Sequence, residues 1–254
     1  MRVFFELRKE LIFSIALYLL LKIFFINDFF SEYIEQVILY TVIIIVSALG
    51  LNIIYGYTGQ FSLGHAGFYG LGAYFSAYLT KTFSIESAFF FIIIIFLSGC
   101  FTALIAYLIG IPILKFRDDF LAIATLGLGI LIRNVLDNSD RFIETLGGSR
   151  GFVGINNLSN LEIVFFVSLF FILISKNIIY SRYGLFWRTI RDDEIASSSI
   201  GINTTNLKLL AFVYGCFLAG SAGAMYAHLY TFLHPSNFDF LKSVDFLVIV
   251  IIGG

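Results

Sequence analysis

The stretch of sequence best suited to hydrogen-bond chemistry is a polar, glycine-rich run over residues 56–74, between two apolar runs. Glycine, threonine and glutamine at residues 56–60 favour a break in a helix. A helix that restarts after a break presents free N–H groups and a positive dipole end, which suit an anionic group such as a carboxylate. The residues predicted to line a solute pathway here are Thr58, Gln60, Ser62, Gly64 and His65.

Helix packing is the alternative interpretation of the same stretch. Small residues let helix backbones approach closely inside a bilayer, where lipid offers no competing hydrophobic drive. Read as a helix over 61–79, the sequence gathers small residues on one face, namely Ser62, Ala66, Gly70, Ala73 and Ala77. A second helix carries the pairs Gly215 with Ala219 and Gly220 with Ala224. For His65, a packing role and a pathway role both remain open.

The most polar segment of the chain spans residues 181–206. Asp192 or Asp193 can cap the start of a short helix, where acidic side chains are favoured. Gly201 suits its end in a left-handed conformation, which predicts a helix of about two turns. Ile195, Ala196 and Ile200 would share one side of that helix. The pattern alone fits either a solvated connector or a docking helix for a partner.

The remaining sequence is apolar enough to place both segments in a membrane protein. Hydrophobic residues make up 59% of the chain and charged residues 13%, against about 25% charged in soluble domains. Apolar stretches of about 20 residues recur and are typical of membrane-spanning helices. Eight spans are predicted, near 11–27, 36–55, 61–80, 86–111, 120–137, 161–180, 207–231 and 244 onward. The predicted fold is an all-α polytopic bundle of about eight transmembrane helices, forming one domain over 1–254 with the last helix truncated.

The distribution of lysine and arginine predicts the orientation of this bundle, because these residues favour cytoplasmic loops. If every span crosses, ten of the 16 basic residues lie on the N-terminal side and five on the other, with Lys22 inside the first span. The N-terminus, retained rather than cleaved, and the segment 181–206 are therefore expected in the cytoplasm.

Several function classes are disfavoured by what the sequence lacks. No Gly-x-x-x-x-Gly-Lys-Ser/Thr motif occurs, so the chain is not itself a P-loop ATPase. The net charge of −1 gives no basic surface for nucleic acid. Cys100 and Cys216 sit in apolar runs and are expected to pack as small hydrophobic residues. His228 and His234 do not share a helix face, so no zinc site is expected. The carboxylates at residues 192–194 lack a histidine or a second carboxylate cluster that would complete a metal or acid–base site, so no catalytic centre and no cofactor are expected. The near absence of acidic residues inside the spans also disfavours a proton- or sodium-driven carrier.

Several motifs, in order along residues 40–254, resemble permeases of the high-affinity branched-chain amino acid ABC importers. They are Gly59–Phe68 with Gly72-Ala73-Tyr74, Phe120–Gly129, Thr145–Ile155, Arg188–Ala196 with Gly201-Ile202-Asn203, Lys208–His228 and His234–Phe238. The sequence is most similar to the M-type subunit of that family. One departure is Ile130, where the family often has a glutamate. Urea and short-amide permeases share much of the pattern, and a membrane scaffold without a pathway is an alternative of another class.

The resemblance implies a partnership rather than a self-sufficient transporter. Such an importer pairs two related permease subunits in the bacterial or archaeal plasma membrane with two cytoplasmic ATP-binding subunits and an extracytoplasmic solute-binding protein. The segment that docks on the ATPase matches Arg188, Arg191, Asp192, Asp193, Glu194, Ala196 and Gly201. Hydrolysis in the partner would then rock the spans through this coupling segment.

Overall fold

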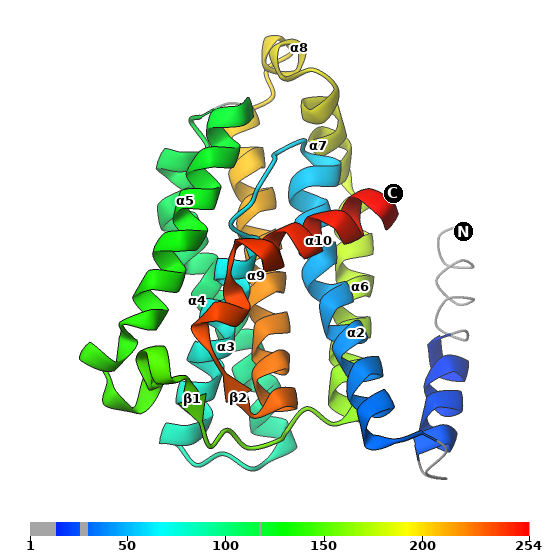
Figure 1. Ribbon diagram of the computed structural model, residues 1–254. Helices are drawn as coiled ribbons and strands as arrows, with labels where there is room; N and C mark the ends of the chain where they lie inside the picture. The colour runs from blue at the N-terminus through cyan, green and yellow to red at the C-terminus, as the bar shows by residue number, and fades with distance from the viewer. Residues whose placement is uncertain (1–13, 26–29, 117, 254) are drawn as a thin grey trace.

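Long helices run side by side through the protein, as the computed structural model shows (Figure 1). It describes residues 14–25, 30–116 and 118–253; the basic residues before residue 10 and the ends of the first predicted span lie outside this part. A helix at Ser14–Phe25 comes first. It is followed by α2 (Glu32–Asn52), η1 (Ile53–Tyr57), α3 (His65–Thr82), α4 (Ala88–Ile113), α5 (Asp118–Asp137), η2 (Ser139–Arg141), η3 (Glu144–Leu146), η4 (Gly148–Arg150), β1 (Phe152–Val153), α6 (Leu161–Ile179), α7 (Arg182–Asp192), α8 (Glu194–Ser199), α9 (Thr204–Tyr230), β2 (Phe232–Leu233), η5 (Pro235–Phe238) and α10 (Phe240–Gly253).

The central element of the bundle is α9, which packs against α2, α3 and α4. Its glycines allow this packing, because a Cβ on Gly72 of α3 would meet the backbone of Gly220. The predicted small-residue face of α3 meets α9 in part only. Ala73 of that face lies against Gly223 of α9, but Gly70 lies against the Phe238 ring, and Gly72, which was not assigned to that face, touches α9. Both faces of α3 are buried, so helix spacing alone could not tell which one meets a neighbour.

Helical structure is found within all eight predicted spans, and five of the described helices are long and apolar enough to cross a membrane. These five are Glu32–Tyr57, Ala88–Ile113, Phe120–Asp137, Leu161–Ile179 and Thr204–Tyr230. The Ser14–Phe25 helix and α10 are shorter. The helix α3 is continuous but carries several glycine and polar residues, which lower its hydropathy. An all-α polytopic membrane fold is therefore confirmed, while the count of eight full spans is only approximate.

The two ends of the bundle differ in what they carry (Figure 1). One end holds α7, α8 and the start of α9, and we call it the α8 end. The other holds the loop from η2 to residue 160 and a short antiparallel pairing of β1 with β2, in which Phe152 faces Leu233; we call it the β end. The chain after α2 runs from the α8 end down to the middle of the bundle, where α3 begins.

Candidate functional site

The helix break predicted near residue 58 begins where α2 widens into a π-helical turn, Ile53–Tyr57. Gly59 follows with φ of 72°, a left-handed conformation that favours glycine. The Gly59 amide donates to the carbonyl of Tyr55 at 2.9 Å, and the Gln60 amide donates to the carbonyl of Ile54 at 3.1 Å. These bonds close the helix end in the manner of a glycine cap. The predicted break is confirmed, and single π-turns of this kind are frequent at functional sites.

The next helix starts later than the sequence predicts. The pattern indicates a helix directly after the break, whereas α3 begins at His65 and residues 61–64 are not helical. Their backbone groups find partners outside a helix: the amide of Leu63 donates to the hydroxyl of Thr125 on α5 at 3.0 Å. Ser62 consequently lies outside α3 and does not belong to its small-residue face.

The polar side chains of the break bond to one another and to α9. The Thr58 hydroxyl donates to the carbonyl of Ile54 at 2.6 Å. The amide nitrogen of Gln60 donates to Thr58 Oγ1 at 2.6 Å and to the backbone carbonyl of Lys208 at 3.1 Å. The exposed fractions of Thr58 and Gln60 are 2% and 3%. The side-chain oxygen of Gln60 is buried without a hydrogen-bond partner.

His65 is held at one ring nitrogen and unpaired at the other. Its Nε2 lies 2.9 Å from the backbone carbonyl of Ser47, so Nε2 carries the proton in this contact. Nδ1 is buried without a partner, and the ring packs edge-on against Phe246 of α10. The His65 ring is therefore packed like a core residue, while Nδ1 keeps an unused hydrogen-bonding capacity.

The start of α3 is covered by two neighbouring helices. The amide of Ala66 donates to the Ser243 hydroxyl of α10 at 3.0 Å. Gly64 lies against the carbonyl of Thr125, leaving no room for a Cβ. The structure therefore gathers the predicted pathway residues at one place but seals them inside the chain. Side chains of α5 and α10 occupy positions around the helix start at which an anionic group would bind.

In the second polar segment, the structure contains a helix that the sequence pattern did not predict. One short helix was expected, whereas α7 precedes it and spans 11 residues. Gly184, Trp187 and Ile190 are buried along one face at a spacing of three, which was the available signal. Ser181 caps the helix by accepting from the amide of Tyr183 at 3.2 Å. The indole of Trp187 donates to the carbonyl of Leu207, so α7 is fixed against α9.

The short helix predicted from its capping residues corresponds to α8, six residues long. The Asp193 carboxylate accepts from the amide of Ala196 at 2.9 Å, as an N-cap does. Gly201 follows the helix with φ of 86°. Of the two capping residues left open by the sequence, Asp193 is the one used, and the predicted end is confirmed.

The predicted coupling residues face two directions. Ile195 and Ile200 of the predicted contact side are 72% and 76% exposed, and Ala196 and the Asp192 side chain are also exposed. The two arginines among these residues lie on α7, and both contact the π-helical turn. Arg191 Nη1 donates to the carbonyl of Gly56 at 2.7 Å, and the Arg188 guanidinium lies 5.3 Å from the centre of the Tyr57 ring.

A cavity at the α8 end lies between the helix break and α7. Its volume is about 710 Å³. The break contributes Tyr55 and Tyr57 to its lining, α7 contributes Arg188 and Arg191, and α10 contributes Val250 among others. The break and the α7–α8 segment, which the sequence treats as separate features, therefore share one site.

Comparison with known families matches residues 33–254 to branched-chain amino acid transport system / permease component. The high-affinity branched-chain amino acid transport system permease protein LivM of Salmonella typhimurium is 32% identical over 84% of this chain. LivM of Escherichia coli is 31% identical over the same share. The chain spans 57% of the length of each of these two relatives.

A more distant relative is the probable branched-chain amino acid transport permease protein LivH of Methanocaldococcus jannaschii. It is 24% identical over 87% of this chain and 73% of its own length. The sequence is thus more similar to the LivM proteins than to this LivH protein. No solved structure gives a significant match.

Proposed function

This chain belongs to the family of branched-chain amino acid transport permeases, and its sequence is of the M type; on that basis we propose that it is a membrane-spanning subunit of an ATP-binding cassette importer. It carries branched-chain or related amino acids inward, and a separate ATPase supplies the energy. Its partners are a second permease subunit, two cytoplasmic ATP-binding subunits and an extracytoplasmic solute-binding protein.

The observation that carries this proposal is the exposed surface of α8. Ile195 and Ile200 are large apolar side chains held outside the bundle on a helix capped at both ends. Exposed apolar side chains on a positioned short helix suit contact with another protein. The segment 181–206 would thus dock on the ATPase, with the N-terminus and the α8 end in the cytoplasm.

The break at residues 58–65 is proposed as the gate of the solute pathway. In the present conformation Ser243 and Thr125 bond to amides near the start of α3. Movement of α10 or α5 would free these amides for the carboxylate of an amino acid, because a helix N-terminus favours negative charge. The pathway residues Thr58, Gln60, Ser62, Gly64 and His65 would then face water.

Docking is tested by replacing Ile195 of α8 and Ile200, the residue after this helix, with glutamate in the tagged full-length protein and measuring copurification of the ATPase. We expect the I195E/I200E variant to lose the ATPase while keeping the second permease. The control is F142E at the β end, where Phe142 is 81% exposed. Retention of the ATPase by I195E/I200E, at the level of F142E, would contradict the docking role.

The solute class is tested by uptake in cells that lack the chromosomal copy of this gene. Labelled leucine uptake should return with the wild-type chain and should be competed by unlabelled isoleucine and valine, but not by urea. Competition by urea alone would indicate a short-amide permease instead. Absence of any uptake, together with no copurifying ATPase, would indicate a membrane scaffold and overturn the proposal.

A further inference from the structure

Two polar arms connect α7 and α8 to the helix break, and we propose that they transmit the movement of the docked segment to the gate. The first arm is Arg191, which bonds to Gly56. The second arm runs from Glu194 through Lys208 to Gln60. This inference rests on the proposed function, and it makes Gln60 the receiving end of a mechanical connection rather than a solute ligand.

The first arm joins the last turn of α7 to the π-helical turn. The guanidinium of Arg191 donates to the carbonyl of Gly56 at 2.7 Å. The Arg191 Cγ also lies 3.2 Å from the position that a Cβ on Gly59 would take. A charged donor on a backbone carbonyl is stronger than a neutral hydrogen bond. Displacement of α7 therefore acts directly on the residues that close α2.

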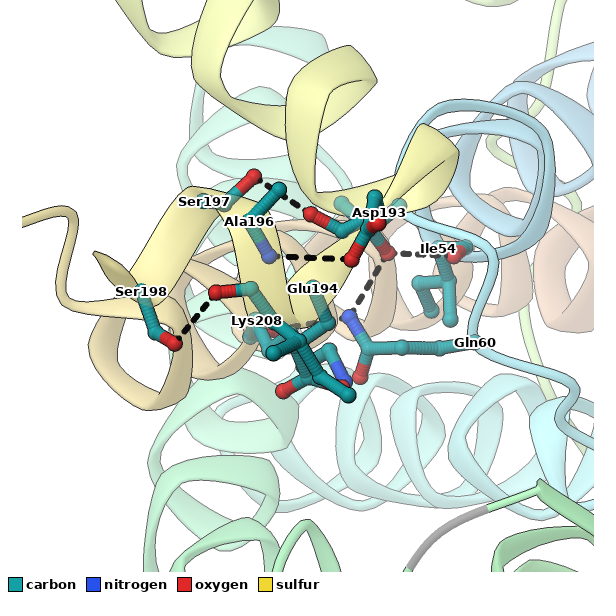
Figure 2. A network of polar contacts seen from close by, with 10 residues as sticks. Ile54, Gln60, Asp193, Glu194, Ala196, Ser197, Ser198 and Lys208 are labelled. Atoms are coloured by element: carbon teal, nitrogen blue, oxygen red, sulfur yellow. Dashed lines mark hydrogen bonds and ion pairs between the residues drawn. The ribbon is translucent and has the colours of Figure 1, made fainter. Parts of the chain in front are cut away.

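The second arm begins at the first residue of α8 (Figure 2). Lys208 Nζ lies 2.6 Å from the Glu194 carboxylate, and the two side chains are only 16% and 30% exposed. The backbone carbonyl of Lys208 accepts from the Gln60 amide at 3.1 Å. Gln60 in turn donates to the Thr58 hydroxyl at 2.6 Å. A connected series of polar contacts thus leads from α8 to the break.

The side chain of Gln60 also indicates that the helix break has a second conformation. Its side-chain oxygen is buried and unpaired, while its nitrogen is fully engaged with Thr58 and Lys208. An unpaired buried acceptor is costly and is rare in native proteins. We infer that the oxygen gains a partner when the break moves. Both arms end within the seven residues Ile54–Gln60, so they act on a single hinge.

The test uses the whole importer in proteoliposomes, with solute uptake and ATP hydrolysis measured on the same sample. Three variants break the second arm: K208M, which keeps the aliphatic stem, E194Q and Q60L. The matched control is K115M, which makes the same substitution as K208M at an exposed lysine outside the segment 181–206. Copurification of the ATPase is measured for each variant, so that loss of assembly is separated from loss of transmission.

Coupling between two sites in a protein is typically worth about 5- to 150-fold, so each arm variant should lower uptake per ATP at least about fivefold. K115M should match wild type. The K208M/Q60L double variant should be no worse than the poorer single variant, because both residues belong to one arm. The charge swap E194K/K208E should recover a large part of the lost coupling, which a merely structural role of Lys208 would not predict.

Unchanged uptake per ATP in assembled K208M and E194Q complexes would overturn the inference, as would a double variant whose loss equals the product of the two single losses. If Q60L fails to fold, K208M and E194Q together still decide the outcome. Failure of the proposed function gives a different result: the wild-type complex would then show no solute-dependent ATP hydrolysis and no uptake.

Discussion

The α8 end and the β end of the bundle are both cross-linked by polar groups, but the links are of opposite kinds. At the β end, fully buried His228 binds the carbonyl of Asn156 through Nδ1 at 2.8 Å and the hydroxyl of Ser76 through Nε2 at 2.9 Å. At the α8 end, Arg191 of α7 reaches the Gly56 carbonyl with a long charged side chain that is 48% exposed.

This difference indicates which end can move. Breaking a buried hydrogen bond leaves an unpaired polar group and costs about 1–3 kcal/mol. An exposed ion pair competes with water and is worth only about 0–1 kcal/mol. The His228 contacts at the β end are therefore fixed, whereas the Arg191 contact at the α8 end can be exchanged at low cost. A segment that must transmit movement needs links of the second kind.

The largest effect is expected from G72V, which would break the packing that both ends share. A valine side chain at this position collides with the backbone of Gly220, and a backbone cannot yield as a side chain can. We expect destabilisation of about 3 kcal/mol or more, seen as loss of the monodisperse protein in detergent. G127V on α5 is the control, since nothing lies within 4 Å of its Cβ position. Equal behaviour of the two variants would contradict the α3–α9 contact.

A smaller but clear loss is expected from H228L at the β end. The leucine leaves the Asn156 carbonyl and the Ser76 hydroxyl without their present partner. The buried Ser76 hydroxyl left unpaired costs about 1–3 kcal/mol, so thermal unfolding in detergent should shift by several degrees. A variant that unfolds at the wild-type temperature would show that the β end is not fixed in this way.

The matched change at the α8 end is R191M, because the Arg191 side chain is 48% exposed and its contacts should contribute less than about 1 kcal/mol of stability. Its thermal unfolding should therefore lie close to wild type, although its uptake per ATP falls. If R191M destabilised the protein as much as H228L, the contrast between the two ends would be wrong.

The smallest effect is expected from K22Q. This variant tests whether the strength of a polar link depends on its exposure to solvent or on the end of the bundle at which it lies. Lys22 pairs with Glu162 at 2.8 Å near the β end, and the side chains are 40% and 61% exposed. Because exposed pairs contribute little, no measurable shift in unfolding temperature is expected. A shift as large as that of H228L would mean that position, rather than burial, decides the strength of a link.

Local signals in the sequence predicted the break, the caps of α8 and most helices, because glycine, capping residues and apolar length act within a few residues. The start of α3 at His65 was missed because residues 63 and 64 contact Thr125, which lies far along the chain: its hydroxyl accepts from the Leu63 amide and its carbonyl lies against Gly64. The connection from Glu194 to Gln60 was equally hidden, since it passes through the Lys208 backbone carbonyl, which has no sequence signature. Burial of the predicted pathway residues also depends on α5 and α10, which the local pattern does not place.

The most direct test is the reactivity of S62C toward a small water-soluble thiol reagent, in a chain whose native cysteines are replaced by alanine. Ser62 is 3% exposed in the present conformation. S62C should be protected at rest and become reactive during ATP turnover, and addition of K208M should abolish that gain. Equal reactivity at rest and during turnover, or a gain that survives K208M, would contradict a gate at this break driven from α7 and α8.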